Sequence, residues 1–356
     1  MPRTEISAHF DAARWGRLHP GSAVQSACWI DIMLSRLPGK PLMVLHEDDD
    51  GAALGFVGAV VGEPGAYEAY NPWTILRADP EVFPAAHADG PVAPQLGGAA
   101  EDMLPSVVLS APGYLGDPVG PAGRRPDAVR DCLSAVLDHA RDAGLATVCV
   151  LYSTPEGAAV LDLVTTELGG ASFDLTSRSV LEIGWADWDG YHSGPRNRRR
   201  AEILRQLRRL AEAGGEVVRE DPRPRFDEVV AARCCLLRHY GQPADEESER
   251  RRLHALIEAF GDDLVLYSVV REGRLLAHAL FVAQDRVLQN IYAGTTEEGR
   301  ATPYAHLAAT YYAPLMYVTS KEFDRIDYGV GHETTKRLRG CLVVPLRGHL
   351  LPVGGR

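Results

Sequence analysis

The sequence has few cysteines, no long apolar run and no excess of positive charge, and each absence excludes a class of protein. Only six of the 356 residues are cysteine, and no two of them form a C-x-x-C pair. A disulfide-stapled secreted domain and a structural zinc site are therefore not expected. No apolar stretch approaches the roughly 20 residues that a membrane-spanning helix needs, and residues 1–21 lack the apolar core of a secretory signal. We expect a reduced, cytoplasmic protein without membrane contact.

The balance of charge limits the possible partners. The chain has 37 Lys and Arg against 48 Asp and Glu, which gives a net charge of −11. A polyanion prefers a basic surface, so a general nucleic-acid binder is not expected, and any contact with RNA would need a local basic patch. Hydrophobic residues make up 46% of the sequence and charged residues 24%, as in ordinary globular proteins. The length predicts about two domains.

Apolar periodicity predicts a similar order of elements in the two halves of the chain. In the first half, helices are expected at 26–35, 126–143 and 156–168, and strands at 41–46, 54–61, 106–110, 147–152 and 179–183. In the second half, helices are expected at 197–213, 226–240, 247–259, 303–319 and 333–339, and strands at 216–219, 264–271, 275–283, 287–293, 325–328 and 343–351. Each half therefore contains helices, an antiparallel meander, and then helix, strand, helix, strand.

One segment of the second half, residues 327–340, is distinctive and reads DYGVGHETTKRLRG. It lies where a predicted strand passes into a short helix, and its glycines indicate a tight backbone. The segment resembles the D-x-G-x-G-x-x-x-x-K-x-x-x-G block of Fem-like transferases and of related peptidoglycan biosynthesis and recognition proteins. The basic run at 196–209 resembles the arginine-rich helix that opens the second lobe of those proteins. The resemblance covers residues 190–350, and earlier residues match only in the order of their elements.

The resemblance implies an α/β (α+β) protein with a tandem, duplicated GNAT-like acyltransferase fold. Each lobe would hold a twisted mixed sheet flanked by helices, and we expect the lobes to be residues 1–188 and 189–356. The second lobe would carry the acyl-donor site. Seryl transferases of natural-product pathways, which acylate a hydroxylamine from seryl-tRNA, share this layout and are the nearest expected relatives.

The activity implied is N-acylation of a small amine or hydroxylamine by an aminoacyl-tRNA, without a covalent enzyme intermediate. The ester of the donor is already activated, so no cofactor and no metal are expected. Two alternatives stay open, namely transfer from acyl-CoA or an acyl carrier protein, and a non-catalytic binding module with the same fold. A CoA donor would need a Q/R-x-x-G-x-G/A loop, but residues 295–301 read TTEEGRA, whose two acids would oppose a pyrophosphate. A glycine-rich loop at 113–125 is another candidate phosphate cradle.

The glycine block supplies the candidate catalytic residues. Lys336 stands at the lysine position of the block, where the resemblance implies handling of the acyl donor, and an ammonium there would stabilise the oxyanion of acyl transfer. The alternative is a solvated lysine on a short helix. Asp327 and Glu333 are candidates for the general base. Their structural alternatives are a turn cap for Asp327 and a first-turn anion of the helix for Glu333.

The candidate binding residues form two groups. The donor group would neutralise the phosphates of a tRNA or shape the loop beside them, although a solvated helix face is the alternative for its arginines. Its members are Arg196, Arg198, Arg199, Arg205, Gly329, Gly331 and Arg339. The acceptor group, mostly from an aromatic, proline-rich loop, is Tyr70, Trp73, Arg77 and Tyr304. Cys341 follows the block directly, but no His–Asp pair at a diagnostic spacing supports a nucleophile, so packing is the better interpretation.

Overall fold

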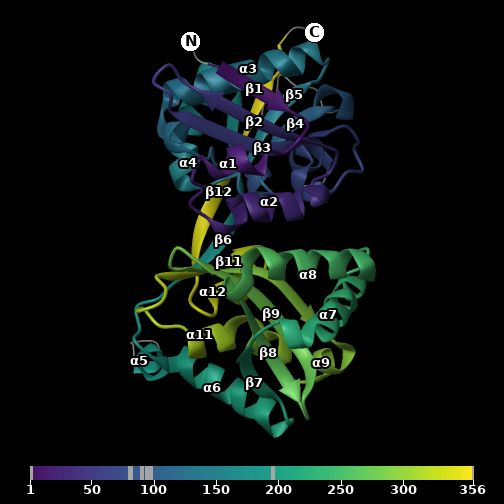
Figure 1. The fold of residues 1–356 in the computed structure, drawn as a ribbon, viewed down its shortest axis with the longest axis vertical. Coiled ribbons are helices and arrows are strands. Elements are labelled where there is room, and N and C mark those ends of the chain that lie inside the picture. The colour runs from purple at the N-terminus through teal and green to yellow at the C-terminus, as the bar shows by residue number, and fades with distance from the viewer. Residues whose placement is uncertain (1–2, 79–82, 89–91, 93–98, 194–196, 355–356) are drawn as a thin grey trace. The chain divides into compact units, whose positions relative to one another are not determined.

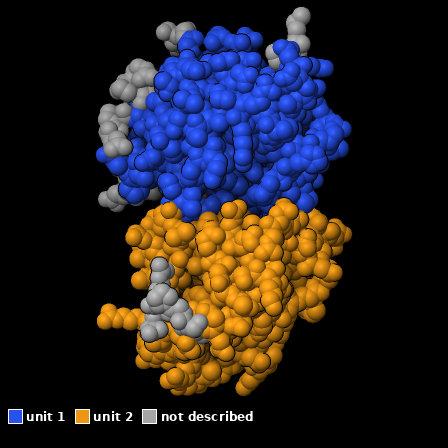
Figure 2. Space-filling view, turned by 90° about the vertical axis from the view of Figure 1, so that its left-hand side faces the viewer, with its two compact units in different colours: residues 1–178, 344–356 blue, residues 179–343 orange. Residues whose placement is uncertain are grey.

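The computed structural model describes residues 3–78, 83–88, 92, 99–193 and 197–354, and the chain forms two compact units. Unit 1 comprises Met1–Arg178 and Val344–Arg356, and unit 2 comprises Ser179–Val343, as coloured in Figure 2. The predicted division at residue 188 therefore differs from the observed one in two respects. The first boundary lies after Arg178, and the C-terminal residues from Val344 belong to unit 1. Among these residues His349 is fully buried, and its Nε2 atom lies 2.7 Å from Ser153 Oγ.

The sheet of unit 1 has the strand order β1-β2-β3-β4-β5-β12. Its strands are β1 (Arg3–Ser7), β2 (Lys40–Glu47), β3 (Ala53–Val61), β4 (Ser106–Leu109), β5 (Thr147–Ser153) and β12 (Leu342–Pro352), and its main helices are α1 (Ala12–Gly16), α2 (Ala27–Met33), α3 (Pro126–Asp142) and α4 (Pro155–Glu167). Neighbouring strands are antiparallel except β4 and β5, which are parallel. The apolar stripe of α3 packs on the sheet around Val44, Phe56 and Val150. The strands expected at 41–46 and 54–61 form a hairpin, in whose turn Asp48 accepts a hydrogen bond from Ala52 N at 2.9 Å.

The sheet of unit 2 has the order β11-β10-β9-β8-β7. Its strands are β7 (Glu216–Glu220), β8 (Leu264–Arg271), β9 (Arg274–Gln284), β10 (Val287–Thr295) and β11 (Arg325–Val330), and its helices are α5 (Trp188–Ser193), α6 (Asn197–Glu212), α7 (Phe226–His239), α8 (Glu246–Phe260), α9 (Glu297–Ala301), α10 (Ala305–Leu307), α11 (Ala313–Tyr317) and α12 (Glu333–Arg337). Helix α7 packs on one face of the sheet, whereas α6 and α11 contribute to the core on the other (Figure 1). Strand β6 (Ala171–Glu182) leads from unit 1 into unit 2.

Strands β10 and β11 pair in parallel only at their beginnings. The paired positions run from Val287 and Arg325 to Gln289 and Asp327. Beyond them β10 shifts its register against β9 between Asn290 and Tyr292, and then follows β9 to its end. A bulge of this kind bends and twists a strand. The two strands therefore part after Asp327, and β11 leads directly into the glycine block.

The predicted α/β class is confirmed, because both units contain a mixed sheet flanked by helices. Strand β1 and helices α1, α5 and α9 were not predicted. The helix expected at 303–319 is interrupted by a π-helical turn at Ala308–Tyr312. Among the residues that the structure describes, no helix combines the length and apolarity that a membrane crossing requires.

Candidate functional site

The glycine block forms a tight turn between β11 and α12, in which three of the four positions 329–332 have a left-handed backbone. Gly329 and Gly331 have φ angles of +66° and +76°, and His332, which precedes α12, has +51°. Glycine adopts such angles without the steric cost that a Cβ atom brings. The buried Asp327 carboxylate closes the turn by accepting from Gly329 N at 2.7 Å. Asp327 is thus the turn cap considered from the sequence, and its role as a base stays a prediction.

Lys336 lies beneath this turn and is only 4% exposed. Its Nζ atom donates to the carbonyl oxygens of Tyr328, Gly329 and Val330 at 2.8, 3.0 and 2.9 Å. An ammonium has three N–H donors, which matches these three acceptors. A buried charge without partners would be costly, so these bonds explain how a lysine can be enclosed here. Lys336 therefore holds the end of β11, and it is not a solvated surface residue.

A cavity of ≈ 680 Å³ lies between α6 and the α12 region of unit 2. Its lining residues are Arg198, Arg199, Glu202, Ile203, Gln206, Tyr312, Thr334, Arg337, Leu338 and Arg339. Four of these side chains are guanidinium groups, and one is a carboxylate. The cavity is therefore locally basic in a chain whose net charge is −11. Lys336 does not line it.

Arg199 joins the two sides of the cavity. Its Nε atom donates to Leu338 O at 2.9 Å, so the start of α6 is tied to the end of α12. Gly340, the last glycine of the block, has φ +101°, and a Cβ atom there would lie 2.3 Å from Arg199 Nη1. This close contact and the positive φ angle explain why the last position of the block is a glycine. Both Arg199 and Gly340 belong to the segments that carried the resemblance.

A chain of hydrogen bonds runs along the cavity wall. Arg339 donates from Nη2 to the Tyr312 hydroxyl at 3.2 Å, and its guanidinium lies over the Tyr311 ring, 5.0 Å from the centroid. The Tyr312 hydroxyl donates to Gln206 Oε1, and Gln206 Nε2 donates to Glu202. Burial raises the pKa of Tyr312, against the opposing effect of Arg339. The π-helical turn brings Tyr312 to this wall, and such turns are frequent at functional sites.

The remaining predicted donor and catalytic residues lie at the edge of this site or outside it. Arg205 points to Glu202, with Nη2 2.6 Å from Oε1, and does not line the cavity. Glu333 forms an exposed ion pair with Arg337 at 3.4 Å. Arg196 lies outside the described residues.

The predicted acceptor residues are divided between the two units. Tyr70, Trp73 and Arg77 belong to unit 1, whereas Tyr304 belongs to unit 2. The buried Tyr70 ring stacks on Tyr114 with centroids 5.5 Å apart, and burial is the main cause that raises the pKa of its hydroxyl. Arg77 donates from Nη2 to Val92 O at 2.8 Å. These contacts place the three unit 1 residues in a packed loop, and their role in acceptor binding stays a prediction.

The glycine-rich loop of unit 1 is filled by the chain itself. A Cβ atom on Gly116, Gly120 or Gly123 would lie 2.1, 2.5 or 2.7 Å from a backbone carbonyl oxygen. Carbonyl oxygens repel a phosphate, whereas a phosphate cradle presents N–H groups. Arg125, which precedes α3, is also engaged with Asp48 at 2.7 Å. The glycines are thus explained by close backbone packing.

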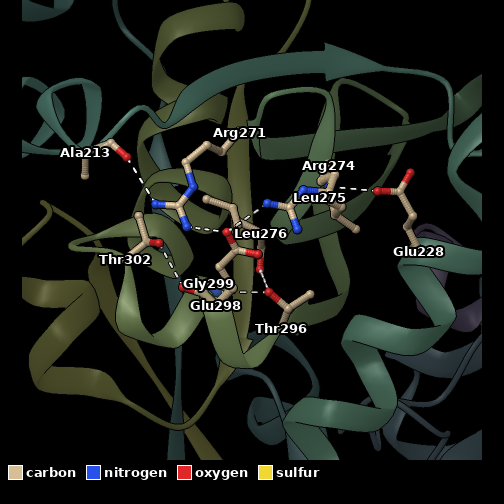
Figure 3. Close-up of polar contacts among 10 residues, drawn as sticks. All are labelled: Ala213, Glu228, Arg271, Arg274, Leu275, Leu276, Thr296, Glu298, Gly299 and Thr302. Carbon is tan, nitrogen blue, oxygen red and sulfur yellow. Dashed lines mark hydrogen bonds and ion pairs between the residues drawn. The ribbon is translucent and has the colours of Figure 1, made fainter.

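The segment 295–301 is a structural latch in unit 2 (Figure 3). Glu298 pairs with Arg271 and with Arg274, the latter at 3.3 Å, and the bond to Arg271 is the main cause that lowers its pKa. Gly299 packs so closely on Leu276 that a Cβ atom would lie 2.0 Å from that carbonyl oxygen. The carboxylate is therefore ionised and held at the β8–β9 turn. The guanidinium groups of Arg271 and Arg274 are thus engaged with this carboxylate.

The sequence matches no protein-family model and no curated protein at a significant level. Among solved structures, FemX aligns with a TM-score of 0.60 over 97% of this chain and 96% of its own, at 12% identity. A conserved protein of unknown function from Bacteroides thetaiotaomicron VPI-5482 aligns with a TM-score of 0.58 over 99% and 100%, at 10% identity. At such identities the likeness concerns the fold alone. It shows that the chain has the fold of FemX, as the resemblance to Fem-like proteins implied.

Proposed function

We propose that the protein is an acyltransferase that moves an aminoacyl group from an aminoacyl-tRNA onto a small amine or hydroxylamine in a biosynthetic pathway. The cavity of unit 2 would receive the 3′ end of the donor. The observation that carries this proposal is the arginine lining of that cavity, contributed by Arg198, Arg199, Arg337 and Arg339. Guanidinium groups bind phosphates in a fixed fork geometry and keep their charge at any physiological pH.

The basic lining of the cavity is significant because the chain as a whole is acidic. A chain with net charge −11 repels RNA in general, so a basic cavity concentrates its attraction at one place. The resemblance of residues 327–340 to the Fem-like block implies an aminoacyl-tRNA donor, and the fold is that of FemX. A CoA donor is less well supported, since the latch around Glu298 occupies the loop where its pyrophosphate would bind.

The proposed reaction needs positioning more than chemistry from the protein. The acceptor nitrogen attacks the ester carbonyl carbon, and the bond to the ribose oxygen breaks. The proton lost by nitrogen is balanced by one gained by that oxygen. Holding the two reactants in register supplies much of the rate enhancement. In this account Lys336 is a positioning residue, because an oxyanion contact would require its ammonium to give up one of three carbonyl partners.

The experiment that tests the function follows deacylation of an aminoacyl-tRNA mixture. We expect the protein to consume one amino acid from the mixture when a suitable amine is present, and to form the matching amide. Loss of acyl groups from acetyl-CoA or an acylated carrier protein instead would establish the alternative donor. Retained binding of the amine without turnover on any donor would establish the binding module.

A further inference from the structure

In the chain of hydrogen bonds on the cavity wall, each residue donates to the next, and Glu202 is the final acceptor. Arg339 donates to Tyr312, Tyr312 donates to Gln206, and Gln206 donates to Glu202. Arg205 adds two more donors, from Nε to Oε2 at 2.9 Å and from Nη2 to Oε1 at 2.6 Å. An ionised carboxylate accepts hydrogen bonds and donates none. These hydrogen bonds therefore fix the orientation of the Glu202 carboxylate, which is the last acceptor of the series.

Glu202 differs in kind from the other polar groups of the cavity. Guanidinium groups are donors only, and the amide oxygen of Gln206 already accepts from Tyr312. Among the described residues that line the cavity, Glu202 is thus the one ionised acceptor. A phosphate or carboxylate ligand would be satisfied by the arginines alone. A ligand with an ammonium group needs this carboxylate.

We infer that Glu202 binds the α-ammonium group of the donor and makes the cavity selective for aminoacyl over simple acyl groups. This inference rests on the proposed function and identifies the α-ammonium group as the part of the donor that the protein recognises. Each carboxylate oxygen can accept more than one hydrogen bond, so an ammonium can join without displacing Arg205 or Gln206.

The surroundings of Glu202 keep it charged. The hydrogen bond from Arg205 is the first cause that lowers the pKa of Glu202, and the charge of Arg209 acts in the same direction. The other charged or titratable groups on the cavity wall are Arg198, Arg199, Tyr312, Arg337 and Arg339. None of the side chains that line the cavity is a second carboxylate. The simpler interpretation is a solvent-exposed i,i+3 ion pair with Arg205, whose side chains are 45% and 48% exposed, and it predicts no selectivity.

Three probes separate these interpretations. The first is 3′-aminoacylamino-3′-deoxyadenosine 5′-phosphate, whose amide resists hydrolysis; the second is its N-acetyl form; the third is adenosine 5′-phosphate. We expect Glu202→Gln to weaken binding of the first probe by at least about tenfold, and to leave the other two within about twofold. Glu212→Gln, at the far end of the same helix, is the matched control and should change none of them.

A pH series gives a second readout. The affinity of the wild-type protein for the first probe should fall as pH rises through the pKa of the α-amine, about 8, because the ammonium loses its charge. The N-acetyl probe should show no such fall. Equal weakening of all three probes by Glu202→Gln, or selectivity unchanged by it, would overturn the inference and leave the proposed function standing. Failure of every probe to bind wild type would instead count against the proposed function itself.

Discussion

At the scale of single residues, the structure gives Lys336 a set of contacts that the sequence did not predict. The sequence places it in the glycine block, and the structure encloses its ammonium among three carbonyl oxygens. The buried ammonium thereby supplies hydrogen-bond donors to three successive carbonyl oxygens at the end of β11. Lys336 thus stabilises the backbone that leads into the glycine block.

Lys336→Met tests this role, because it keeps most of the side-chain volume and removes the three donors. We expect a loss of at least about 2 kcal/mol in the free energy of unfolding, since buried carbonyls are left without partners. Chemical denaturation measures the loss, with the exposed Lys321→Met as control. A variant as stable as wild type that has lost about two to three orders of magnitude in single-turnover rate would instead support the oxyanion role.

Gly340 gives a second prediction at this scale. Gly340→Ala strains a φ of +101° and places a Cβ atom 2.3 Å from Arg199 Nη1, so it should cost about 1–2 kcal/mol and also displace Arg199 from the cavity. Gly261→Ala, with φ +52° and no heavy atom within 4 Å of the new Cβ, isolates the strain. Weaker binding of the RNA donor should appear only in the Gly340 variant. Equal affinity in both variants would remove Arg199 from the donor site.

The other cavity residues mark the limit of what the sequence reveals about single positions. Arg198, Arg199 and Arg339 were predicted from the motif and the basic helix, and all three line the cavity. Tyr312 reads as a core residue, because helical periodicity places it on the buried face. Tyr312 is indeed buried in the core of unit 2, and the π-helical turn, which no sequence pattern predicts, also brings it to the cavity wall. Gln206 was missed because its partner, Tyr312, lies 106 residues away, and the place of Glu202 on the cavity wall depends on that same contact.

At the scale of elements, the latch formed by α9 and the β8–β9 turn separates this chain from the CoA pattern. Glu298 has a lowered pKa because Arg271 bonds its ionised form. Its stabilising effect is therefore present above its ordinary value of 4.5 and is lost as pH falls through the folded-state value. We expect Glu298→Gln to lower Tm at pH 7, with the difference vanishing as the pH falls below the lowered pKa of Glu298 in the folded state. Thermal melts of both proteins across pH measure this, and a difference independent of pH would contradict it.

The predicted elements were mostly correct where the pattern is local. Helix α3 has a continuous apolar stripe, and the hairpin of β2 and β3 has an Asp-Gly turn, so both follow from short-range physics. Strand β1 and helices α1, α5 and α9 are each six residues or fewer, which is too short for periodicity to decide. The helix expected from 303 begins only at Ala305, because Tyr304, with φ +62°, adopts a left-handed backbone that bulky residues rarely take.

At the scale of the whole molecule, the order of elements predicted the tandem architecture, whereas the extent of each unit was not accessible. Strand β12 pairs with β5 at positions as far apart as Leu350 and Cys149, and such non-local pairing leaves no trace in local composition. The acidic net charge was equally misleading when taken alone. It concealed a basic cavity that forms only when α6 meets α12.

The measurement that tests the central claim most directly is the salt dependence of aminoacyl-tRNA binding in two matched variants. Arg337 and Arg251 are both exposed arginines with an i,i+4 glutamate partner, at 3.4 and 3.2 Å, but only Arg337 lines the cavity. We expect Arg337→Ala to reduce the slope of log affinity against log salt by about 1, because one phosphate contact and its released counterion are lost. Arg251→Ala should leave the slope unchanged. Identical slopes in wild type and both variants would contradict the assignment of the cavity to an RNA donor.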